Sequence, residues 1–298
     1  MRLHSWRAGL ISTALALTAV STTAPAPALA AVSDGGANII GGSDASQPYP
    51  FAARLLTVYP GLGTGRCTAT VVTDHGRTGI VTAAHCVTDF ATADAVAAGD
   101  VTVQVGSTRL DQLTNITPPR IEVHPGWSWG TGGGPIADLA VLVLPQGVHV
   151  RGIPLGGRAG VARGVRLLGW GKTTVDATQP PPVLQQLDTW TTDPSNCAAA
   201  GITAGELCID AREGGSPCLG DSGGPALGRT AHTRWVLLGG ASRGPADPAT
   251  GEETCAGPTV YTDFTAYRGW IRTALAHRQP HHRRHVATGA ADRFLNLR

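Results

Sequence analysis

The chain has 298 residues, of which 40 are glycine and 21 are proline, and its formal net charge is only +2. Glycines and prolines this frequent exclude a fold built from long helices, and neither the charge nor any aromatic pattern favours nucleic-acid binding. The 21 residues after His277 hold five arginines and one aspartate, which leaves residues 39–277 with a net charge of about −3. We therefore expect residues 278–298 to form a basic, disordered tail.

The first thirty residues have the layout of a secretory signal peptide. Arg2 and Arg7 precede an uncharged run from Ala8 to Val20, and small residues at 28–30 supply a cleavage site. A transmembrane helix is the alternative, but it needs about 20 predominantly apolar residues, and Thr and Ser interrupt this run. We expect a secreted, extracellular protein with a signal peptide at 1–30, a short propeptide at 31–38 and no membrane span.

Residues 39–277 alternate short apolar runs with turn residues, a pattern typical of an all-β sandwich or barrel. The candidate strands are 51–58, 68–72, 80–83, 101–105, 139–144, 165–169, 184–187, 235–238 and 260–262. One helix is predicted near the end, with Thr262 or Asp263 as its N-cap, and we expect it to pack on the second half of the fold. Its apolar residues recur at helical spacing: Phe264, Tyr267, Trp270, Ile271, Ala274 and Leu275.

The segment 216–225 (SPCLGDSGGP) places Ser222 next to glycines. A serine hydroxyl is a weak nucleophile near neutral pH, so it needs a base and a site that binds the oxyanion. Glycines allow sharp turns in which backbone N–H groups can point at a developing negative charge. The segment also fits a surface turn rich in glycine and proline, so the interpretation depends on a base elsewhere in the chain.

His85 and Asp138 are the candidate base and the candidate group that orients it. His85 ends the apolar run 81–86 (VTAAHC), where small alanines precede it and a cysteine follows it. Asp138 stands at the head of the apolar run 137–144 (ADLAVLVL). A buried carboxylate is costly unless it is paired, and a histidine N–H is a suitable partner.

Five segments of the chain resemble the secreted chymotrypsin/trypsin-like serine proteases. We interpret the chain as resembling a bacterial-type member of that family. They are 39–42 (IIGG), 82–86 (TAAHC), 138–142 (DLAVL), 169–171 (GWG) and 220–225 (GDSGGP), and they follow the family's order of His, Asp and Ser. The resemblance implies an all-β fold of two six-stranded antiparallel β-barrels with a C-terminal helix. The first barrel would span 39–150, and the second barrel with the helix would span 151–277.

The resemblance implies a serine endopeptidase that works through an acyl-enzyme and needs no metal or organic cofactor. Ser222 is expected as the nucleophile, His85 as the general base and acid, and Asp138 as the carboxylate that orients the imidazole. The N–H groups of Gly220 and Ser222 would form the oxyanion hole. Its partners would be protein or peptide substrates and proteinaceous inhibitors, and we expect a monomer.

The resemblance also implies activation by a cut before Ile39. The new amine would turn inward and pair with Asp221, which would order the loop that carries the oxyanion-hole N–H groups. Asn38 stands before the cut instead of Lys or Arg, which disfavours activation by a trypsin-like enzyme.

Six cysteines, an even number, agree with an oxidising compartment and by themselves allow 15 pairings. A zinc site is the alternative, but the sequence contains no CxxC pair. The resemblance selects the pairs Cys67–Cys86, Cys197–Cys208 and Cys218–Cys255.

The resemblance places Ser216, six residues before the nucleophile, at the floor of the primary specificity pocket. Its neutral hydroxyl disfavours cleavage after Lys or Arg. Gly244 would leave the pocket wall open and Thr259 would make the pocket shallower, so we expect cleavage after small to medium apolar residues. Ser242 would offer its carbonyl to the substrate backbone, and Arg243 would place a charge beside the cleft.

Two functions of other classes remain as alternatives. The segment Gly220–Gly224 also fits the G-x-S-x-G motif of an α/β-hydrolase-type esterase, with Asp247 or Asp263 and then His277. Only 76 residues follow Ser222, however, and the upstream chain lacks alternating strands and long helices. The other alternative is a non-catalytic binding protein on a protease scaffold, because intact candidate residues do not show that the propeptide is removed.

Overall fold

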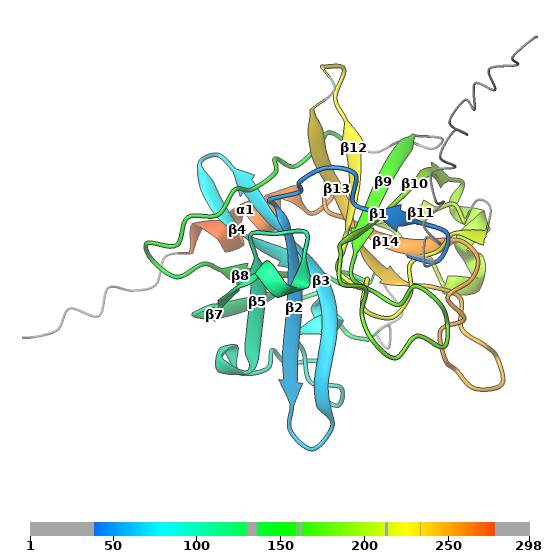
Figure 1. The fold of residues 1–298 in the computed structure, drawn as a ribbon, viewed down its shortest axis with the longest axis horizontal. Coiled ribbons are helices and arrows are strands. Elements are labelled where there is room, and N and C mark those ends of the chain that lie inside the picture. The colour runs from blue at the N-terminus through cyan, green and yellow to red at the C-terminus, as the bar shows by residue number, and fades with distance from the viewer. Residues whose placement is uncertain are drawn as a thin grey trace, which may run out of the picture. The chain divides into compact units, whose positions relative to one another are not determined.

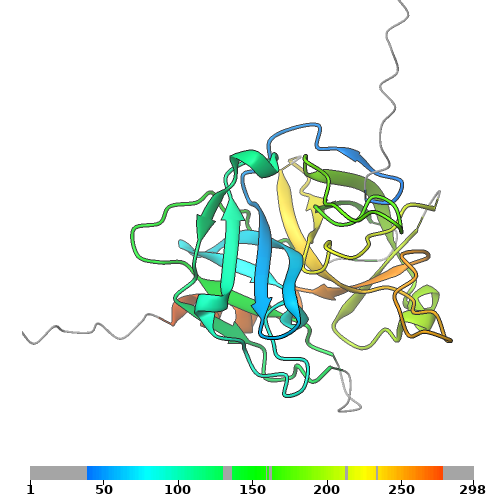
Figure 2. The ribbon, with the colours of Figure 1, turned by 60° about the horizontal axis from the view of Figure 1, so that its bottom comes forward.

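The computed structural model describes residues 39–129, 136–158, 160, 163–211, 214–232 and 234–277. The expected signal peptide, propeptide and basic tail lie outside these residues. The chain folds into two β-sheets, and apart from the short β1, which joins the second sheet, one is formed by the first half of the described chain and the other by the second half (Figures 1 and 2). No helix in the described ranges has the length and apolar character needed to cross a membrane.

The first sheet has the strand order β6-β5-β2-β3-β4-β8-β7, and every neighbouring pair is antiparallel. In β5 the buried valines alternate with half-buried Thr102 and Gln104, which is the period-2 pattern of a strand with one buried face. The strands are β2 Ala52–Tyr59, β3 Gly63–Asp74, β4 Arg77–Thr82, β5 Val101–Val105, β6 Thr114–Ile116, β7 Arg120–Val123 and β8 Ala140–Val143.

The first sheet has seven strands where the sequence analysis expects a six-stranded barrel, and β6 and β7 are its two edges. Pro118 and Pro119 separate β6 from β7. Proline has no N–H to donate to a ladder, so a prolyl pair interrupts what would otherwise be one strand.

The second sheet closes on itself, because β9 pairs with both β10 and β12. Its six-stranded barrel follows the order β9-β10-β11-β14-β13-β12, and the short β1 adds to β10. The expected architecture of two barrel-like β-sheets with a C-terminal helix is confirmed, although only the second sheet closes into a six-stranded barrel. The strands are β1 Ser43–Asp44, β9 Gly164–Gly169, β10 Gln185–Thr192, β11 Glu206–Ile209, β12 Pro225–Arg229, β13 Trp235–Arg243 and β14 Thr259–Asp263.

Among the described residues, short 3₁₀ helices lie between the strands, including η1 Ala84–Cys86, η2 Ala98–Asp100, η3 Leu110–Gln112 and η4 Pro194–Ala200. A single apolar cluster runs from the first sheet into the second, since it includes Val71 and Leu142 together with Leu168 and Leu237. The two sheets are therefore packed against each other through apolar side chains, which fixes the segments at their junction.

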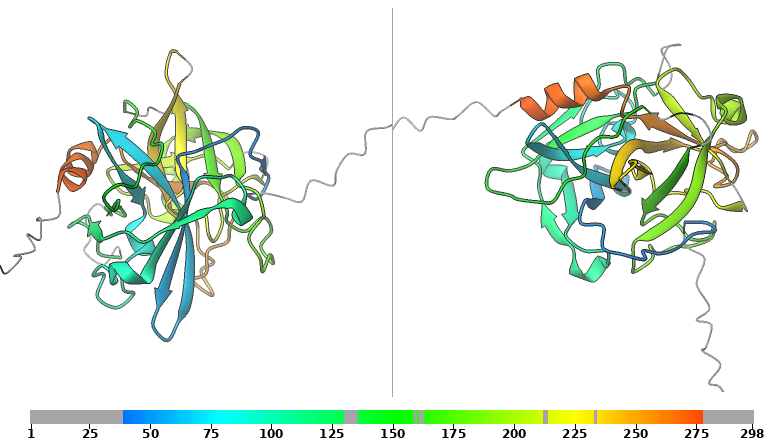
Figure 3. Two further views of the ribbon diagram at one scale, coloured as in Figure 1. Left: turned by 60° about the vertical axis from the view of Figure 1, so that its left-hand side comes forward. Right: turned by 90° about the horizontal axis from the view of Figure 1, so that it is seen from above.

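The C-terminal helix α1, Arg268–Ala276, differs from the prediction in two ways. It begins after Tyr267 without a side-chain cap, because the Asp263 carboxylate accepts the N–H groups of Thr265 and Ala266 in the turn before the helix. It also packs on the first sheet, beside β4 and β8, and not on the second (Figure 3). A β-carbon added to Gly79 of β4 would lie 2.4 Å from the Leu275 side chain, so glycine leaves the space that the helix occupies.

Candidate active site

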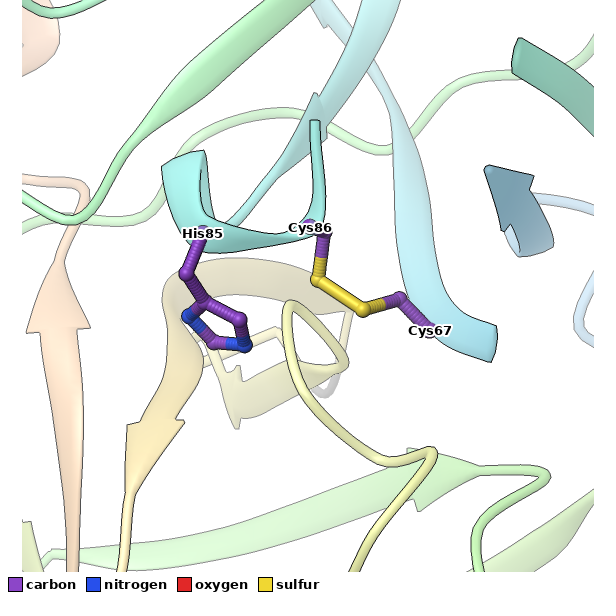
Figure 4. A group of neighbouring side chains, drawn as sticks. All are labelled: Cys67, His85 and Cys86. Atoms are coloured by element: carbon purple, nitrogen blue, oxygen red, sulfur yellow. A yellow bond between two sulfur atoms is a disulfide. The ribbon is translucent and has the colours of Figure 1, made fainter. Parts of the chain in front are cut away.

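His85 lies in the 3₁₀ turn η1, directly after β4. The next residue, Cys86, forms a disulfide with Cys67 of β3, as Figure 4 shows. The sequence separation of 19 residues gives the bond a stabilising effect of about 3 kcal/mol in the chain-entropy model. The histidine is therefore held in a corner that is cross-linked to the neighbouring strand.

The same three side chains have ligand atoms within 4.8 Å of one another (Figure 4). Both sulfur atoms are bonded to each other in the disulfide, however, and cysteine binds a metal ion as a free thiolate. This cluster therefore cross-links the corner that carries His85. The other two disulfides are Cys197–Cys208 and Cys218–Cys255, so all three pairs are those implied by the resemblance.

The Asp138 carboxylate, with only 1% of its side chain exposed, accepts three hydrogen bonds. The His85 backbone N–H donates to Oδ1 at 3.0 Å, and the imidazole Nδ1–H donates to Oδ2 at 2.8 Å. The hydroxyl of Ser242, on β13, donates to Oδ2 at 2.7 Å. The turn η1, which follows β4 of the first sheet, and β13 of the second sheet therefore hold this carboxylate beside the imidazole.

The electrostatics of the His85–Asp138 pair favour the protonated imidazolium form of His85. Burial alone would lower the pKa of His85, but the adjacent Asp138 carboxylate outweighs it and raises the pKa. Burial alone would raise the pKa of Asp138, but His85 and the Ser242 hydroxyl outweigh it and lower the pKa. A histidine held in this way can accept a proton and keep it next to a carboxylate that stays ionised.

The loop that carries Ser222 is pressed against the segment that leads to His85. The Ser222 carbonyl accepts the Thr68 N–H at 2.9 Å and lies 3.7 Å from the Cys86 sulfur. Gly223 has a φ of +75°, and a β-carbon there would lie 2.1 Å from the Thr82 hydroxyl. Only glycine fits this position, so Gly223 of the GDSGG motif is required both by the backbone conformation of the turn and by the close packing against Thr82.

The strand β13 contacts the other side of this loop. The Gly223 N–H donates to the Ala241 carbonyl at 2.7 Å, one residue before Ser242. The structure therefore brings the segments of His85, Asp138 and Ser222 together at the junction of the two sheets, although they are up to 137 residues apart in the sequence.

Gly220 adopts a φ of +101° in a turn that is closed by a hydrogen bond from the Asp221 N–H to the Cys218 carbonyl. Across the described ranges, neither the Gly220 N–H nor the Ser222 N–H donates to a protein acceptor. Two backbone donors in one turn with no protein acceptor are available to an oxyanion.

Asp221 is 2% exposed, and its carboxylate accepts the N–H groups of Gly171 and Cys218 at 2.8 and 3.0 Å. Burial raises the pKa of Asp221 to about 7, even though these two donors act to lower it. Ile39 is 1% exposed in the apolar cluster of the second barrel. Within the part of the chain that the structure describes, no hydrogen bond joins Ile39 to Asp221, and the two N–H groups are the donors to this carboxylate.

The predicted primary pocket comprises Ser216, Ser242, Gly244 and Thr259. The hydroxyls of Ser216 and Thr259 are 3.2 Å apart and both residues are buried, so the predicted floor consists of neutral groups that contact each other. The expected open wall at Gly244 is wrong, because the Glu253 side chain fills the space beside it. A β-carbon at Gly244 would lie 2.5 Å from Glu253 Oε1.

Arg243 does not present a free charge to the cleft, contrary to the expectation. Its guanidinium forms a bidentate pair with Glu206, at 2.7 and 2.9 Å, and donates to the carbonyls of Ala200 and Gly201. The Glu206 side chain is fully buried, so the arginine neutralises a buried carboxylate.

Sequence reasoning missed an aromatic group beside His85. The rings of Trp127 and Trp129 lie 6.4 and 6.3 Å from the imidazole, and Phe90 lies 5.3 Å from Trp129. The Trp127-Ser-Trp129 sequence was the available signal, but nothing local ties it to a histidine about 40 residues earlier. The side-chain role of Ser242 and the placement of Glu253 were missed for the same reason.

Comparison with known proteins gives a match to the family described as Trypsin over residues 39–271. Brachyurin of Leptuca pugilator is 31% identical over 65% of this chain and 82% of its own length. Trypsin of Xenopus laevis is 28% identical over 80% of this chain and 91% of its own length. Serine protease 1 of Rattus norvegicus is 28% identical over 66% of this chain and 76% of its own length. These relatives are animal proteins and give no support to the bacterial-type interpretation.

Proposed function

Because the chain belongs to the trypsin family and is a serine endopeptidase, we propose that Ser222, His85 and Asp138 are its catalytic residues. The observation that carries this proposal is the His85–Asp138 pair. A buried carboxylate with three donors holds the imidazole Nδ1–H, which leaves Nε2 as the basic nitrogen of the ring.

In the proposed reaction the Ser222 hydroxyl attacks a peptide carbonyl while His85 Nε2 takes its proton. The N–H groups of Gly220 and Ser222 bind the oxyanion, and His85 then gives the proton to the leaving amine. Water, activated by the same imidazole, attacks the acyl-enzyme and releases the second product. Asp138 remains ionised throughout and stabilises the imidazolium.

We also propose that the protein is secreted as a monomeric precursor and activated by a cut before Ile39. The support comes from Asp221, a buried carboxylate for which the described chain offers two N–H donors and no cation. An amine freed at Ile39 would supply that cation. The proposed barrels are 39–150 and 151–277, and the proposed partners are protein or peptide substrates and proteinaceous inhibitors.

For specificity, we propose cleavage after small to medium apolar residues such as Ala, Val, Leu or Met. The hydroxyls of Ser216 and Thr259 support this preference, because a Lys or Arg side chain that reached the floor of the predicted pocket would meet these neutral groups and not a carboxylate. A panel of chromogenic peptides that differ only in the residue before the cut tests it. Faster cleavage after Arg than after Leu would refute the preference.

Labelling of the processed chain with a fluorophosphonate serine probe tests the catalytic assignment. We expect one label on Ser222, no label in Ser222→Ala and a loss of kcat in that variant on the order of 10⁶. Ser107→Ala is a control, because the Ser107 hydroxyl bonds only to Gln112 and the Arg109 N–H. A processed chain that starts at Ile39 and takes no label would instead support a non-catalytic binding protein.

A further inference from the structure

We infer that Glu253 is a specificity-determining residue of the predicted primary pocket, where its side chain closes the wall at Gly244 and excludes large and acidic substrate side chains. This inference rests on the proposed protease function. It deepens that proposal by selecting small side chains from the wider apolar range.

Glu253 belongs to a hairpin between β13 and β14 that is held at both ends (Figure 1). Ala246 pairs with Glu253 in an antiparallel bridge, and the Thr254 N–H donates to the Pro245 carbonyl at 2.9 Å. Cys255 is joined by a disulfide to Cys218, four residues before the proposed nucleophile. The backbone around Glu253 is therefore fixed relative to the catalytic loop.

The side chain of Glu253 folds back onto Gly244. A β-carbon at Gly244 would lie 2.5 Å from Oε1, 3.2 Å from Cγ and 3.3 Å from Cδ, so Glu253 occupies the volume that a side chain at position 244 would fill. Burial raises the pKa of the Glu253 carboxyl, while the backbone of Gly244 and the charge of His85 act to lower it. These contacts place a carboxylate from the hairpin at the wall that the sequence alone predicted to be open.

The charge of Glu253 reaches the catalytic groups. In addition to the effects of burial and, for His85, of Asp138, the negative charge of Glu253 acts to raise the pKa values of His85, Asp221 and Tyr261. Arg243, which precedes Gly244 in the sequence, is bound to Glu206 and not to Glu253. No other arginine or lysine in the described ranges forms an ion pair with Glu253.

Two consequences follow for a substrate side chain that enters this pocket. A long side chain meets the Glu253 methylene and carboxyl groups at the wall and the paired Ser216 and Thr259 hydroxyls at the floor, so small side chains fit best. An acidic side chain meets a like charge in a partly dehydrated site, where repulsion between charges about 4 Å apart is strong enough to exceed a tenfold effect.

Two variants of the full-length, processed protein separate size from charge. kcat/KM is measured on peptides that carry Ala, Leu, Gln or Glu before the cut and are otherwise identical. In Glu253→Ala the Leu/Ala ratio should rise about tenfold because the wall opens. In Glu253→Gln the Leu/Ala ratio should stay unchanged, while the Glu/Gln ratio rises at least tenfold because only the charge is lost.

Glu252→Gln is the matched control, since this neighbouring carboxylate is exposed, and both ratios should stay at their wild-type values. Unchanged ratios in both Glu253 variants, with normal fluorophosphonate labelling, would overturn the inference and leave the proposed protease intact. If the wild-type processed chain itself takes no label, the proposed function fails and the inference fails with it. Normal fluorophosphonate labelling of the Glu253→Gln variant would show that this substitution in the hairpin has not disrupted the fold.

Discussion

Asp221 makes the stability of the unprocessed chain depend on pH. Its carboxyl group is buried at the junction of the two sheets, and the two N–H groups that donate to it do not offset the loss of water around it. The pKa of this group rises from its ordinary value of 3.8 to about 7 in the folded chain. The folded chain therefore holds the proton more tightly than the unfolded chain does.

The sign of the effect follows from this difference. Between pH 4 and pH 7 the unfolded chain has lost the Asp221 proton and the folded chain has kept it, so a rise in pH favours unfolding. The stability that this group contributes at low pH is lost as the pH rises to about 7. The difference between the two pKa values corresponds to about 4 kcal/mol between pH 4 and pH 8.

Denaturation by urea at pH 4 and pH 8 measures this loss, with the change Ser222→Ala to prevent self-cleavage. In a chain that retains residues 31–38, replacing Asp221 by Asn should remove about 4 kcal/mol of the pH dependence. In a chain that begins at Ile39, the freed amine should pair with Asp221 and the same replacement should no longer flatten the curve. The comparison uses slopes against pH, because asparagine also changes the hydrogen bonds at Gly171 and Cys218.

Asp111→Asn is the control, since Asp111 is an exposed carboxylate with an exposed arginine partner, and it should leave the slope unchanged. The reasoning would be refuted if Asp221→Asn left the pH dependence of the longer chain intact. It would also be refuted if the two chains showed the same dependence on Asp221, because the amine at Ile39 would then not be its partner.

Three further substitutions test individual contacts. Arg243→Ala leaves the buried Glu206 carboxylate without its cation and should lower the free energy of unfolding by about 3 kcal/mol, measured in urea. Ser242→Ala removes one of three donors to Asp138 and should lower kcat about tenfold with KM little changed, measured on a peptide substrate. Gly223→Ala places a β-carbon 2.1 Å from a threonine hydroxyl at a positive φ and should cost about 3 kcal/mol or more, seen as a lower Tm.

The sequence by itself determined the local features of this protein. Strand β5 was predicted at Val101–Val105 with its observed bounds, because a short apolar run between turn residues is a property of the segment itself. The strands β1, β6, β7, β11 and β12 were missed, since short or glycine- and proline-containing segments such as β12 (PALGR) give no periodic signal. The motifs around His85, Asp138 and Ser222 were readable because each is a short contiguous run.

Only the tertiary structure decided which surfaces meet. The apolar residues along one face of α1 indicated that this face is buried, but they did not identify the surface that covers it. In the structure the helix packs on the first sheet. Arg243 was a visible charge, but Glu206, 37 residues away, neutralises it. Glu253 reaches the wall at Gly244 because a hairpin and a disulfide fold it back. Periodicity and motifs report the environment that a residue needs, whereas the partner that provides it depends on where distant segments pack.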